Sequence, residues 1–225
     1  MVENEIITVR EEEILDIEVN KDILAANRRL AEAAKKKLDD EGIIAIDIMG
    51  SVGSGKTSII ERLVEKLKGK YRIGMIAGDV ATTIDADRVE RHGVQAVQVN
   101  TGRECHLDAN LVGKALEKFN LETIDLLFIE NVGNLICPGD YPLGTHKRVV
   151  VISVTEGEYM VVKHPLIFKE ANAAVINKID LADVMGTSVE KLVKDAESIN
   201  PNIEVIKTDA KNGVGLDDLI KALNL

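Results

Sequence analysis

Aromatic residues are scarce in this 225-residue chain, which has three Phe, three Tyr and no Trp. Any core must therefore be packed mainly from aliphatic side chains, and the apolar fraction of 45% is ample for one. Basic residues are also in the minority, with 28 Lys and Arg against 38 Asp and Glu and a formal net charge of −10. This acidic balance argues against nucleic acid as a main partner.

Long apolar runs are absent as well, and none approaches the roughly 18 residues needed to span a bilayer. The first five residues, Met-Val-Glu-Asn-Glu, are acidic and lack the basic start of a secretory signal. Two cysteines are too few for a disulfide framework, and in an intracellular chain they are more often thiols or ligands. We expect a soluble cytoplasmic protein with no membrane partner.

The N-terminal region divides into two parts. Residues 1–20 are acidic with weak alternation of apolar residues, which predicts a loose arm or an edge element. Residues 21–40 follow a period near 3.6 and predict a helix, with Asn20 as its N-cap and Gly42 as its C-terminal stop. The sequence shows no boundary of a second domain after this point. We therefore expect an arm at 1–20 and a single domain at 21–225.

From residue 43 the pattern becomes a series of short, continuous apolar runs. Helical segments separate most of them, which favours an α/β fold with a mostly parallel central sheet and helices on both faces. The predicted strands are Ile43–Met49, Tyr71–Ala77, Val94–Val99, Ile124–Ile129, Val149–Val154, Ala173–Ile176 and Ile203–Ile206.

The first predicted strand leads into a glycine-rich segment that matches the phosphate-loop pattern in full. The segment lies between that strand and an amphipathic helix at 57–67, as a P-loop NTPase requires. Its N–H groups and the helix N-terminus favour phosphate, Lys56 would reach the β- and γ-phosphates, and the Thr57 hydroxyl would bind Mg²⁺. The predicted nucleotide-binding residues here are Gly50, Ser51, Gly53, Ser54, Gly55, Lys56, Thr57 and Ser58.

Asn177-Lys178-Ile179-Asp180 follows another predicted strand and resembles the guanine-specificity motif of GTPases. A carboxylate at Asp180 can accept hydrogen bonds from N1–H and the 2-amino group of guanine, two donors that adenine lacks. Lys178 can cover the base with its aliphatic stem, and Asn177 can brace the loop. Asp209 and Ala210 resemble the last base-contacting loop, with the Ala210 N–H near guanine O6.

Two further strand ends supply candidates for the catalytic switch. Glu130 closes an apolar strand and is expected to reach Mg²⁺, while Gly133 would offer its N–H to the γ-phosphate. Asn134 stands where a water-positioning Gln is usual. Asp79 is the candidate for the first switch, as a Mg²⁺ ligand or to orient water, and a helix cap near Thr82 is the less favoured alternative. Since no arginine finger is identifiable, we expect slow intrinsic hydrolysis.

Cys105, His106 and Cys137 form a candidate metal site near these switches. Thiolate and imidazole ligands suit Ni²⁺ and Zn²⁺, and three ligands leave a coordination position open for transfer. From the residues alone, two buried core cysteines explain the pattern at least as well. The other histidines, His92, His146 and His164, are scattered and are interpreted as surface or loop residues.

The segments Thr101-Gly102-Arg103-Glu104-Cys105-His106 and Glu130-Asn131-Val132-Gly133-Asn134-Leu135-Ile136-Cys137-Pro138 closely resemble the HypB family of hydrogenase-maturation GTPases, in the SIMIBI class. The resemblance runs from about residue 20 to the end. It implies GTP or GDP with Mg²⁺, a GTP-dependent homodimer, and nickel delivery to [NiFe]-hydrogenase together with other maturation factors and the hydrogenase large subunit. Some members carry N-terminal Cys or His tracts, which residues 1–20 lack, so nickel storage is not expected.

Three other functions agree with parts of this sequence. A urease-accessory GTPase would be expected to show Cys-Pro-His where this chain has Cys137-Pro138-Gly139. A metal-binding scaffold would hold the nucleotide only structurally, and a small-molecule kinase would rarely read guanine. The sequence leaves open whether Ni²⁺ or Zn²⁺ is bound and which surface meets a partner.

Overall fold

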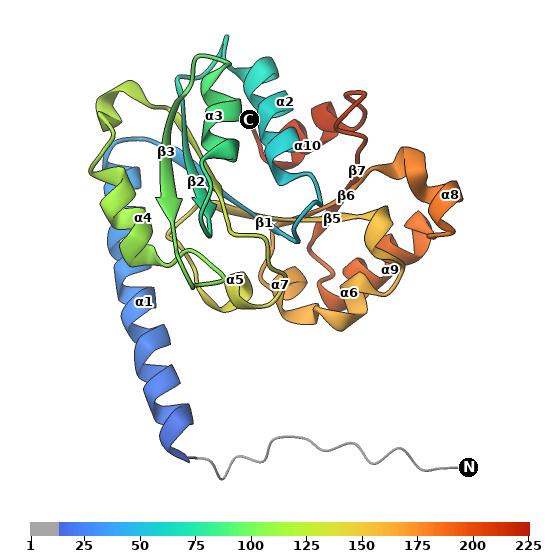
Figure 1. Cartoon of the computed structure of the whole chain (residues 1–225), viewed down its shortest axis with the longest axis horizontal. Helices are drawn as coiled ribbons and strands as arrows, with labels where there is room; N and C mark the ends of the chain where they lie inside the picture. The colour runs from blue at the N-terminus through green and yellow to red at the C-terminus, as the bar shows by residue number, and fades with distance from the viewer. Residues whose placement is uncertain (1–13) are drawn as a thin grey trace.

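The computed structural model describes residues 14–225, with side chains from residue 21 onward. Within that range seven strands form one parallel sheet in the order β3-β2-β4-β1-β5-β6-β7, which confirms the predicted α/β architecture (Figure 1). The strands are β1 (Ile44–Gly50), β2 (Ile73–Asp79), β3 (Gln95–Asn100), β4 (Leu126–Glu130), β5 (Lys147–Ser153), β6 (Ala173–Asn177) and β7 (Glu204–Lys207).

Each strand lies on one predicted apolar run, but β2, β3, β4, β6 and β7 extend past the end of the run to a polar residue. The ladder pairs Asp79 with Asn100, Glu130 with Ile48, and Asn177 with Ser153. The apolar pattern ended these strands too early, because backbone pairing does not depend on the polarity of the side chain. Parallel strands meet with their carboxyl ends at one edge, so these polar side chains are held there by the sheet itself.

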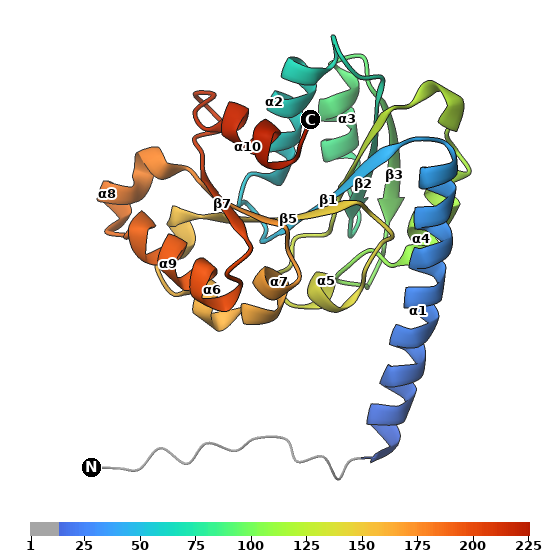
Figure 2. The same cartoon turned by 180° about the vertical axis from the view of Figure 1, so that it is seen from behind.

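Helices cover both faces of the sheet, as Figures 1 and 2 show. On one face, α2, α3 and α10 pack on inward residues such as Ile46, Ile48 and Phe128. On the other face, α1 and α4 cover the β2–β4 side, while α6, α7 and α9 cover the β5–β7 side. The helices are α1 (Ile14–Asp40), α2 (Lys56–Leu67), α3 (Ile84–Glu90), α4 (Ala109–Leu116), α5 (Cys137–Asp140), α6 (Met160–Lys163), α7 (Pro165–Lys169), α8 (Ala182–Met185), α9 (Val189–Ile199) and α10 (Leu216–Ala222).

Helix α1 corrects the predicted N-terminal boundary. It begins at Ile14, so Asn20 is not its N-cap and residues 14–20 do not belong to a loose arm. No Gly or Pro interrupts residues 14–41, and extending an existing helix avoids the cost of a new nucleus. Residues 1–13 of the predicted arm lie outside the described residues. At the other end, Gly42 (φ +68°) ends the helix as predicted.

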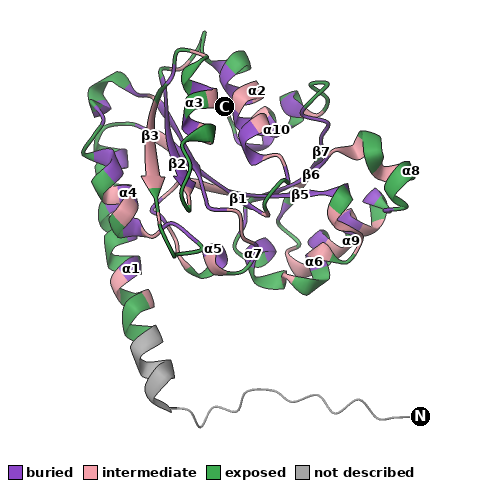
Figure 3. Cartoon of the chain, in the orientation of Figure 1, coloured by how far each residue is buried: buried purple, intermediate pink, exposed green. Residues whose placement is uncertain are grey.

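Burial follows the layers, with the central strands buried between helices whose outer surfaces are exposed and the edge strand β3 only partly buried (Figure 3). Within residues 14–225, no helix has the length and apolar character to cross a membrane. Strand β1 lies between β4 and β5, and the segments that follow β1, β2, β4, β5 and β6 emerge at the same edge of the sheet. That edge is the place where ligands bind in open parallel sheets.

Candidate nucleotide and metal site

The phosphate loop, residues 50–57, follows β1 and enters α2 with a tight backbone. Gly55 has φ +102°, and a Cβ there would lie 2.3 Å from Asn177 Nδ2, so a side chain is excluded. The Ser54 hydroxyl donates to Ser51 O at 2.9 Å. Lys56 Nζ donates to two carbonyls of the loop, Gly50 O at 3.3 Å and Ser51 O at 3.1 Å.

Lys56 is a buried cation at the wall of a cavity of about 390 Å³. Burial lowers the pKa of Lys56, and the nearby Glu130 carboxylate opposes that shift. The cavity is also lined by Gly53, Thr57 and Gly133. A buried ammonium beside a helix N-terminus favours an anion, so this cavity suits the phosphates of a nucleotide.

Two carboxylates converge on the Thr57 hydroxyl, Asp85 Oδ1 at 2.7 Å and Glu130 Oε1 at 2.8 Å. Burial raises the pKa of Glu130 to about 7; Lys56 opposes the shift and Asp85 adds to it. Since one hydroxyl carries one proton, a protonated Glu130 can donate to Thr57 while Thr57 donates to Asp85. The other oxygen, Glu130 Oε2, is buried and has no hydrogen-bond partner among the described residues. This oxygen-rich set with an orphaned carboxylate atom fits Mg²⁺.

Asp79 lies at the same cavity, but its carboxylate has a local task. Asp79 Oδ1 accepts the N–H groups of Ala81 and Thr82, both at 2.8 Å. It thus closes the turn after β2 and does not cap α3, whose N-cap is Thr83, and its second oxygen is left for the cavity. Asp85, in the first turn of α3, reaches Thr57 instead and was not predicted as a ligand. Its only sequence signal was an acidic residue just past Gly78-Asp79.

Arg88, on α3, is a guanidinium at the wall of the phosphate cavity. Its side chain is held by an ion pair with Glu61 and by a hydrogen bond to Ser58 Oγ at 3.1 Å. The sequence did not identify an arginine finger, and in this arrangement Arg88 is committed to α2. Arg88 therefore lines the cavity in a fixed position and is not a mobile cation.

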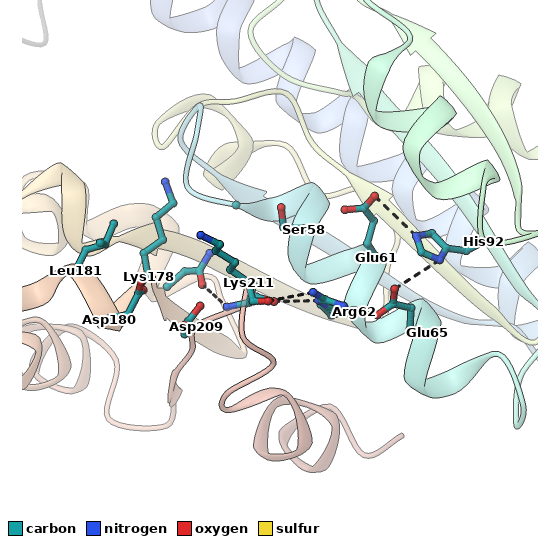
Figure 4. A pocket seen from close by; sticks show the side chains of 13 residues that line it. Ser58, Glu61, Arg62, Glu65, His92, Lys178, Asp180, Leu181, Asp209 and Lys211 are labelled. Carbon is teal, nitrogen blue, oxygen red and sulfur yellow. Dashed lines mark hydrogen bonds and ion pairs between the residues drawn. The ribbon is translucent and has the colours of Figure 1, made fainter.

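A second cavity, of about 560 Å³, adjoins the phosphate loop on the side of β6 (Figure 4). Asn177 joins its walls, donating from Nδ2 to Ser54 O at 2.9 Å and accepting at Oδ1 from Thr208 Oγ1 (3.0 Å) and Ala210 N (3.2 Å). The far wall is formed by Glu61 and Glu65 with His92 between them. His92 Nε2 lies 3.8 Å from Glu61 Oε1, and His92 Nδ1 lies 3.8 Å from Glu65 Oε1. The three loops that were predicted to contact a nucleotide thus meet at one buried amide.

The remaining predicted base-binding residues lie around this second cavity. Asp180 is exposed at its wall, and Lys178 Nζ donates to Gly53 O at 2.7 Å across the entrance. Asp209 also lines the cavity, but its carboxylate is bonded to Asn212, including the Asn212 N–H at 3.1 Å. Asp209 therefore braces its own loop, while the Ala210 backbone is the group placed beside Asn177.

The thiol site, defined as Cys105, His106 and Cys137, brings together residues from two loops. Their ligand atoms all lie within 4.8 Å of one another, and Cys105 Sγ donates to Cys137 Sγ at 2.9 Å. Cys105 is exposed and Cys137 is partly exposed, so the pair is not a core contact. The alternative of two buried core cysteines is therefore wrong.

His106 is the more sheltered member of the thiol site. Burial lowers its pKa, although the nearby Glu104 and Asp108 carboxylates oppose the shift. Its ring packs on the Tyr141 ring, with centroids 3.9 Å apart and planes at 40°. A neutral, oriented imidazole beside two thiols is a donor set for a borderline transition metal such as Ni²⁺ or Zn²⁺.

Known proteins share this arrangement. Residues 44–207 match the family model described as "CobW/HypB/UreG, nucleotide-binding domain". A protein of Methanocaldococcus jannaschii named "Probable hydrogenase maturation factor HypB" is 56% identical over 205 residues, which are 91% of this chain and 93% of that one. The chain belongs to the HypB family.

Solved structures of this family match the fold closely. HypB from Archaeoglobus fulgidus has 48% identity and a TM-score of 0.83, covering 89% of this chain and 98% of that one. HypB from Helicobacter pylori, solved in complex with nickel, has 34% identity and a TM-score of 0.84, covering 88% of this chain and 94% of that one. The resemblance inferred from the sequence motifs is confirmed, as is the presence of a nucleotide-binding P-loop domain.

Beneath the thiol site of this HypB-family chain lies a buried polar network on β1 and β5. Asp47 is fully buried, and Arg148 Nε approaches its Oδ2 at 3.4 Å. Arg148 also donates to the carbonyls of Pro138 and Gly139, the residues that follow Cys137. On the other side, Asn131 Nδ2 donates to Asp47 Oδ1 at 3.2 Å.

Asn131 extends the same network to the other half of the thiol site. Its Oδ1 accepts the N–H of Leu107, the residue after His106, at 3.0 Å. Asn131 directly follows Glu130, so its side chain links the end of β4 directly to the segment of Cys105 and His106. It reaches the segment after Cys137 through Asp47 and Arg148. Neither Asp47, Asn131 nor Arg148 was predicted as a site residue, because their roles depend on contacts between residues far apart in sequence.

The switch segment after β4 lies directly against the phosphate loop. A Cβ on Gly133 would lie 2.4 Å from Val52 Cγ2 and 3.0 Å from Val52 N, so only glycine fits without displacing the loop. Gly133 lines the phosphate cavity, and Cys137 starts α5 just beyond it. The predicted phosphate, base and metal residues therefore form one continuous region, with Gly133 at the contact between its two halves.

Proposed function

We propose that this protein is a GTP-hydrolysing metallochaperone that helps insert nickel into [NiFe]-hydrogenase. The observation that carries the proposal is a chain of hydrogen bonds between the two sites. The Cys105 loop is bonded to Asn131 and Asn134, in the segment that leads from Glu130 to Cys137, and that segment is bonded to the phosphate loop through Asn134 N–H and Gly50 O. The names of the similar proteins, a hydrogenase maturation factor and a HypB solved with nickel, support it. Nickel is here a cargo, held and released, and GTP is the substrate.

Guanine selection is assigned to the second cavity. The Asp180 carboxylate would accept from N1–H and the 2-amino group of guanine, and the Ala210 N–H would donate to O6. The Lys178 stem would cover one face of the base. Asn177 would not select the base itself but would hold the three loops together through its buried amide.

Phosphate binding and hydrolysis are assigned to the first cavity. Lys56 and the N–H groups of the phosphate loop would hold the β- and γ-phosphates, with Gly133 donating to the γ-phosphate. Thr57, Asp85, Glu130 and Asp79 would hold Mg²⁺, which neutralises the charge that develops on the phosphate oxygens during hydrolysis. Water attacks the γ-phosphorus, the bond to the β–γ bridging oxygen breaks, and GDP and phosphate leave.

Intrinsic turnover is expected to be slow, for reasons visible in the site. Asn134 occupies the position of the usual water-orienting Gln, and its carboxamide is bonded to the loops of the thiol site. Arg88 is paired with Glu61 on α2. Neither group is therefore poised to stabilise the transition state, and an added partner would be needed for fast hydrolysis.

Nickel is assigned to the thiol site. Cys105, His106 and Cys137 offer three ligands and leave a coordination position for transfer, and Zn²⁺ would compete for the same set. Exposed apolar side chains near the phosphate loop and thiol site, Val52 and Ile136, support a GTP-dependent homodimer through this face. Other maturation factors and the hydrogenase large subunit are the proposed partners in delivery.

The proposal is tested by measuring Ni²⁺ affinity, metal per monomer and oligomer mass with GDP and with a non-hydrolysable GTP analogue. Nucleotide-dependent affinity in the wild-type protein, lost in Cys137→Ser, is the expected result. An unchanged Ni²⁺ affinity in Cys137→Ser with either nucleotide would show that the thiol site is misassigned.

Turnover separates this function from a scaffold that holds nucleotide only structurally. Purified protein should convert GTP to GDP and phosphate above the uncatalysed background, and Lys56→Ala should abolish the excess. ATP bound as tightly as GTP would instead favour a small-molecule kinase, because the Asp180 carboxylate would then have no role in base choice.

A further inference from the structure

Asn134 is the residue at which the phosphate loop and both halves of the thiol site meet. Its backbone N–H donates to Gly50 O at 3.0 Å. Its Nδ2 donates to Cys105 O at 3.2 Å, and its Oδ1 accepts the N–H of Ile136, the residue before Cys137, at 2.8 Å. A single planar carboxamide therefore joins the backbones that carry the two thiols.

The carbonyl that Asn134 contacts is shared with the candidate phosphate-binding lysine. Lys56 Nζ donates to Gly50 O at 3.3 Å and to Ser51 O at 3.1 Å. A phosphate oxygen is a stronger acceptor for an ammonium than a peptide carbonyl is, because it is charged. When Lys56 moves toward the γ-phosphate, its hydrogen bond to Gly50 O therefore weakens. This changes the strength of Gly50 O as an acceptor for the Asn134 N–H.

The direction of the Asn134 side chain excludes a more familiar role. In the GTPase pattern, a Gln after the switch glycine orients water at the γ-phosphate. Here Gly133 lines the phosphate cavity, whereas both polar atoms of the Asn134 side chain bond the thiol-bearing loops. The side chain faces the metal half of the molecule.

The thiols respond to small movements of these loops. Cys105 Sγ and Cys137 Sγ lie 2.9 Å apart and are attached to different segments. Metal–sulfur bonds near 2.3 Å require a fixed separation and direction of the two sulfurs. A displacement of one carboxamide that is bonded to both backbones therefore changes the ligand geometry directly.

We propose that Asn134 is a positioning residue that couples phosphate occupancy at Lys56 to the spacing of Cys105 and Cys137. The inference rests on the proposed nickel and GTP function and adds the specific contact through which the two sites communicate. Nucleotide acts on Gly50 O, Asn134 transmits the change through its backbone, and its carboxamide shifts both thiol loops together.

The test measures Ni²⁺ dissociation constants by competition with a chromophoric chelator, with Mg²⁺ and either GDP or a non-hydrolysable GTP analogue. The sulfur-to-nickel charge-transfer absorption is recorded in parallel as a direct report on the two thiolates. Couplings between sites commonly amount to about 5- to 150-fold in affinity. The wild-type ratio between the two nucleotides is expected in that range.

In Asn134→Ala, the ratio of the two Ni²⁺ dissociation constants should come to within about twofold of one. The affinity of this variant for the GTP analogue should stay within about threefold of wild type. Asn134→Asp retains the acceptor for Ile136 N–H and loses the donor to Cys105 O, so it should fold normally and also lose most of the ratio. Asn110→Ala, at an exposed position on α4, is the matched control and should behave as wild type.

The outcomes separate the two proposals. A wild-type protein whose Ni²⁺ affinity is the same with both nucleotides overturns the proposed gating and this inference together. A wild-type ratio that persists in Asn134→Ala and Asn134→Asp overturns the role of Asn134 alone. Equal loss of Ni²⁺ binding with both nucleotides, at an unchanged ratio, would show that Asn134 supports the metal site without coupling it, and would also overturn the inference.

Discussion

The nucleotide half and the metal half of this site are built in different ways. Asn177 is almost fully buried, is paired with Ser153 in the sheet ladder, and bonds two loops at once. Cys105 is exposed, lies in a loop between β3 and α4, and meets Cys137 from another loop. The first half is suited to recognise one fixed ligand, whereas the second can change geometry at little cost in packing.

The two halves also differ in where their charge is buried. Lys56 and Glu130 are buried in the nucleotide half and point into its cavity. In the metal half the two cysteines are exposed or partly exposed, and the buried ion pair is Asp47 with Arg148, beneath the loops. Positioning in the metal half is therefore done by residues that do not touch the metal themselves.

The largest predicted effect comes from breaking the buried pair beneath the thiol site. Arg148→Met leaves Asp47 as an uncompensated buried carboxylate and frees the carbonyls of Pro138 and Gly139, so unfolding should become about 3–5 kcal/mol easier. Chemical denaturation measures this change. Ni²⁺ affinity should also fall, while the affinity of the folded protein for GTP stays near that of wild type.

Two controls sharpen this prediction. The double variant Asp47→Asn with Arg148→Met removes both charges and should recover most of the stability but not the Ni²⁺ affinity. Arg72→Met breaks a solvent-exposed pair with Asp125 and should cost far less stability than Arg148→Met, because solvent screens exposed pairs. An Arg148→Met protein as stable as Arg72→Met would mean that the network does not hold the thiol loops.

The raised pKa of Glu130 predicts that the free energy of unfolding depends on pH in protein free of nucleotide and Mg²⁺. Burial raises its pKa from 4.5 to about 7, so between these values the folded protein holds a proton that the unfolded chain has lost. Stability from this group is therefore present at low pH and falls as pH rises through 7, by roughly 3 kcal/mol in total.

Urea unfolding at several pH values from 5 to 8 measures this dependence. Glu130→Gln stays neutral in both states and should flatten the profile across that window. An equally steep profile in Glu130→Gln would assign the dependence to other groups. Added Mg²⁺ should oppose the loss in the wild-type protein, because a deprotonated Glu130 is the form that binds a cation.

Asp180→Asn tests base recognition in the nucleotide half alone. Loss of charge-assisted hydrogen bonds worth about 1.5–3 kcal/mol should weaken GTP binding about 10- to 150-fold. Xanthosine triphosphate should gain affinity, since its C2 carbonyl can accept from the new amide. Calorimetric titration measures both, and Ni²⁺ affinity without nucleotide should remain unchanged. If the Asp180→Asn protein still binds GTP more tightly than xanthosine triphosphate, residues other than Asp180 select the base.

The smallest effect concerns the helix that anchors the Cys105 loop. Asp108 caps α4 by accepting the Leu111 N–H at 2.7 Å, so Asp108→Ala should cost about 1 kcal/mol in stability. Ser188→Ala removes the cap of α9, on the β5–β7 side, and should cost a similar amount. Thermal unfolding compares them, and a lower Ni²⁺ affinity is expected in Asp108→Ala alone.

Most of the fold could be predicted from the sequence because the central strands of the sheet are buried on both faces. Each of these strands is then a nearly continuous apolar run, and the loops between runs are marked by polar residues and glycine. The nucleotide motifs were visible for a related reason. Their residues are neighbours in sequence, since a phosphate loop and a base loop each bind through one short segment. The beginning of α1 at Ile14 was missed because no capping signal marks it.

The unpredicted parts of the site are contacts between distant segments. Asp85 reaches Thr57 because α3 packs beside α2, and Arg148 reaches both Asp47 and the loop after Cys137. Asp209 was expected to contact the base, yet Asn212 occupies its carboxylate. The hydrogen-bond partner of each of these side chains is the group that lies within about 3 Å of it. The spacing of residues along the sequence does not contain that information.

The sequence by itself determined the parallel sheet, the phosphate loop and the family, and it identified the candidate guanine-binding motif and the candidate thiol and imidazole ligands. These features depend on local patterns of polarity and on short motifs. The tertiary structure decided that the two cysteines face one another at the surface, that Asn134 joins them to Gly50, and that Asp47 and Arg148 hold their loops from below. The reason is physical: hydrogen bonds and ion pairs act over a few ångströms, and only folding brings residues 47, 105, 134 and 148 that close.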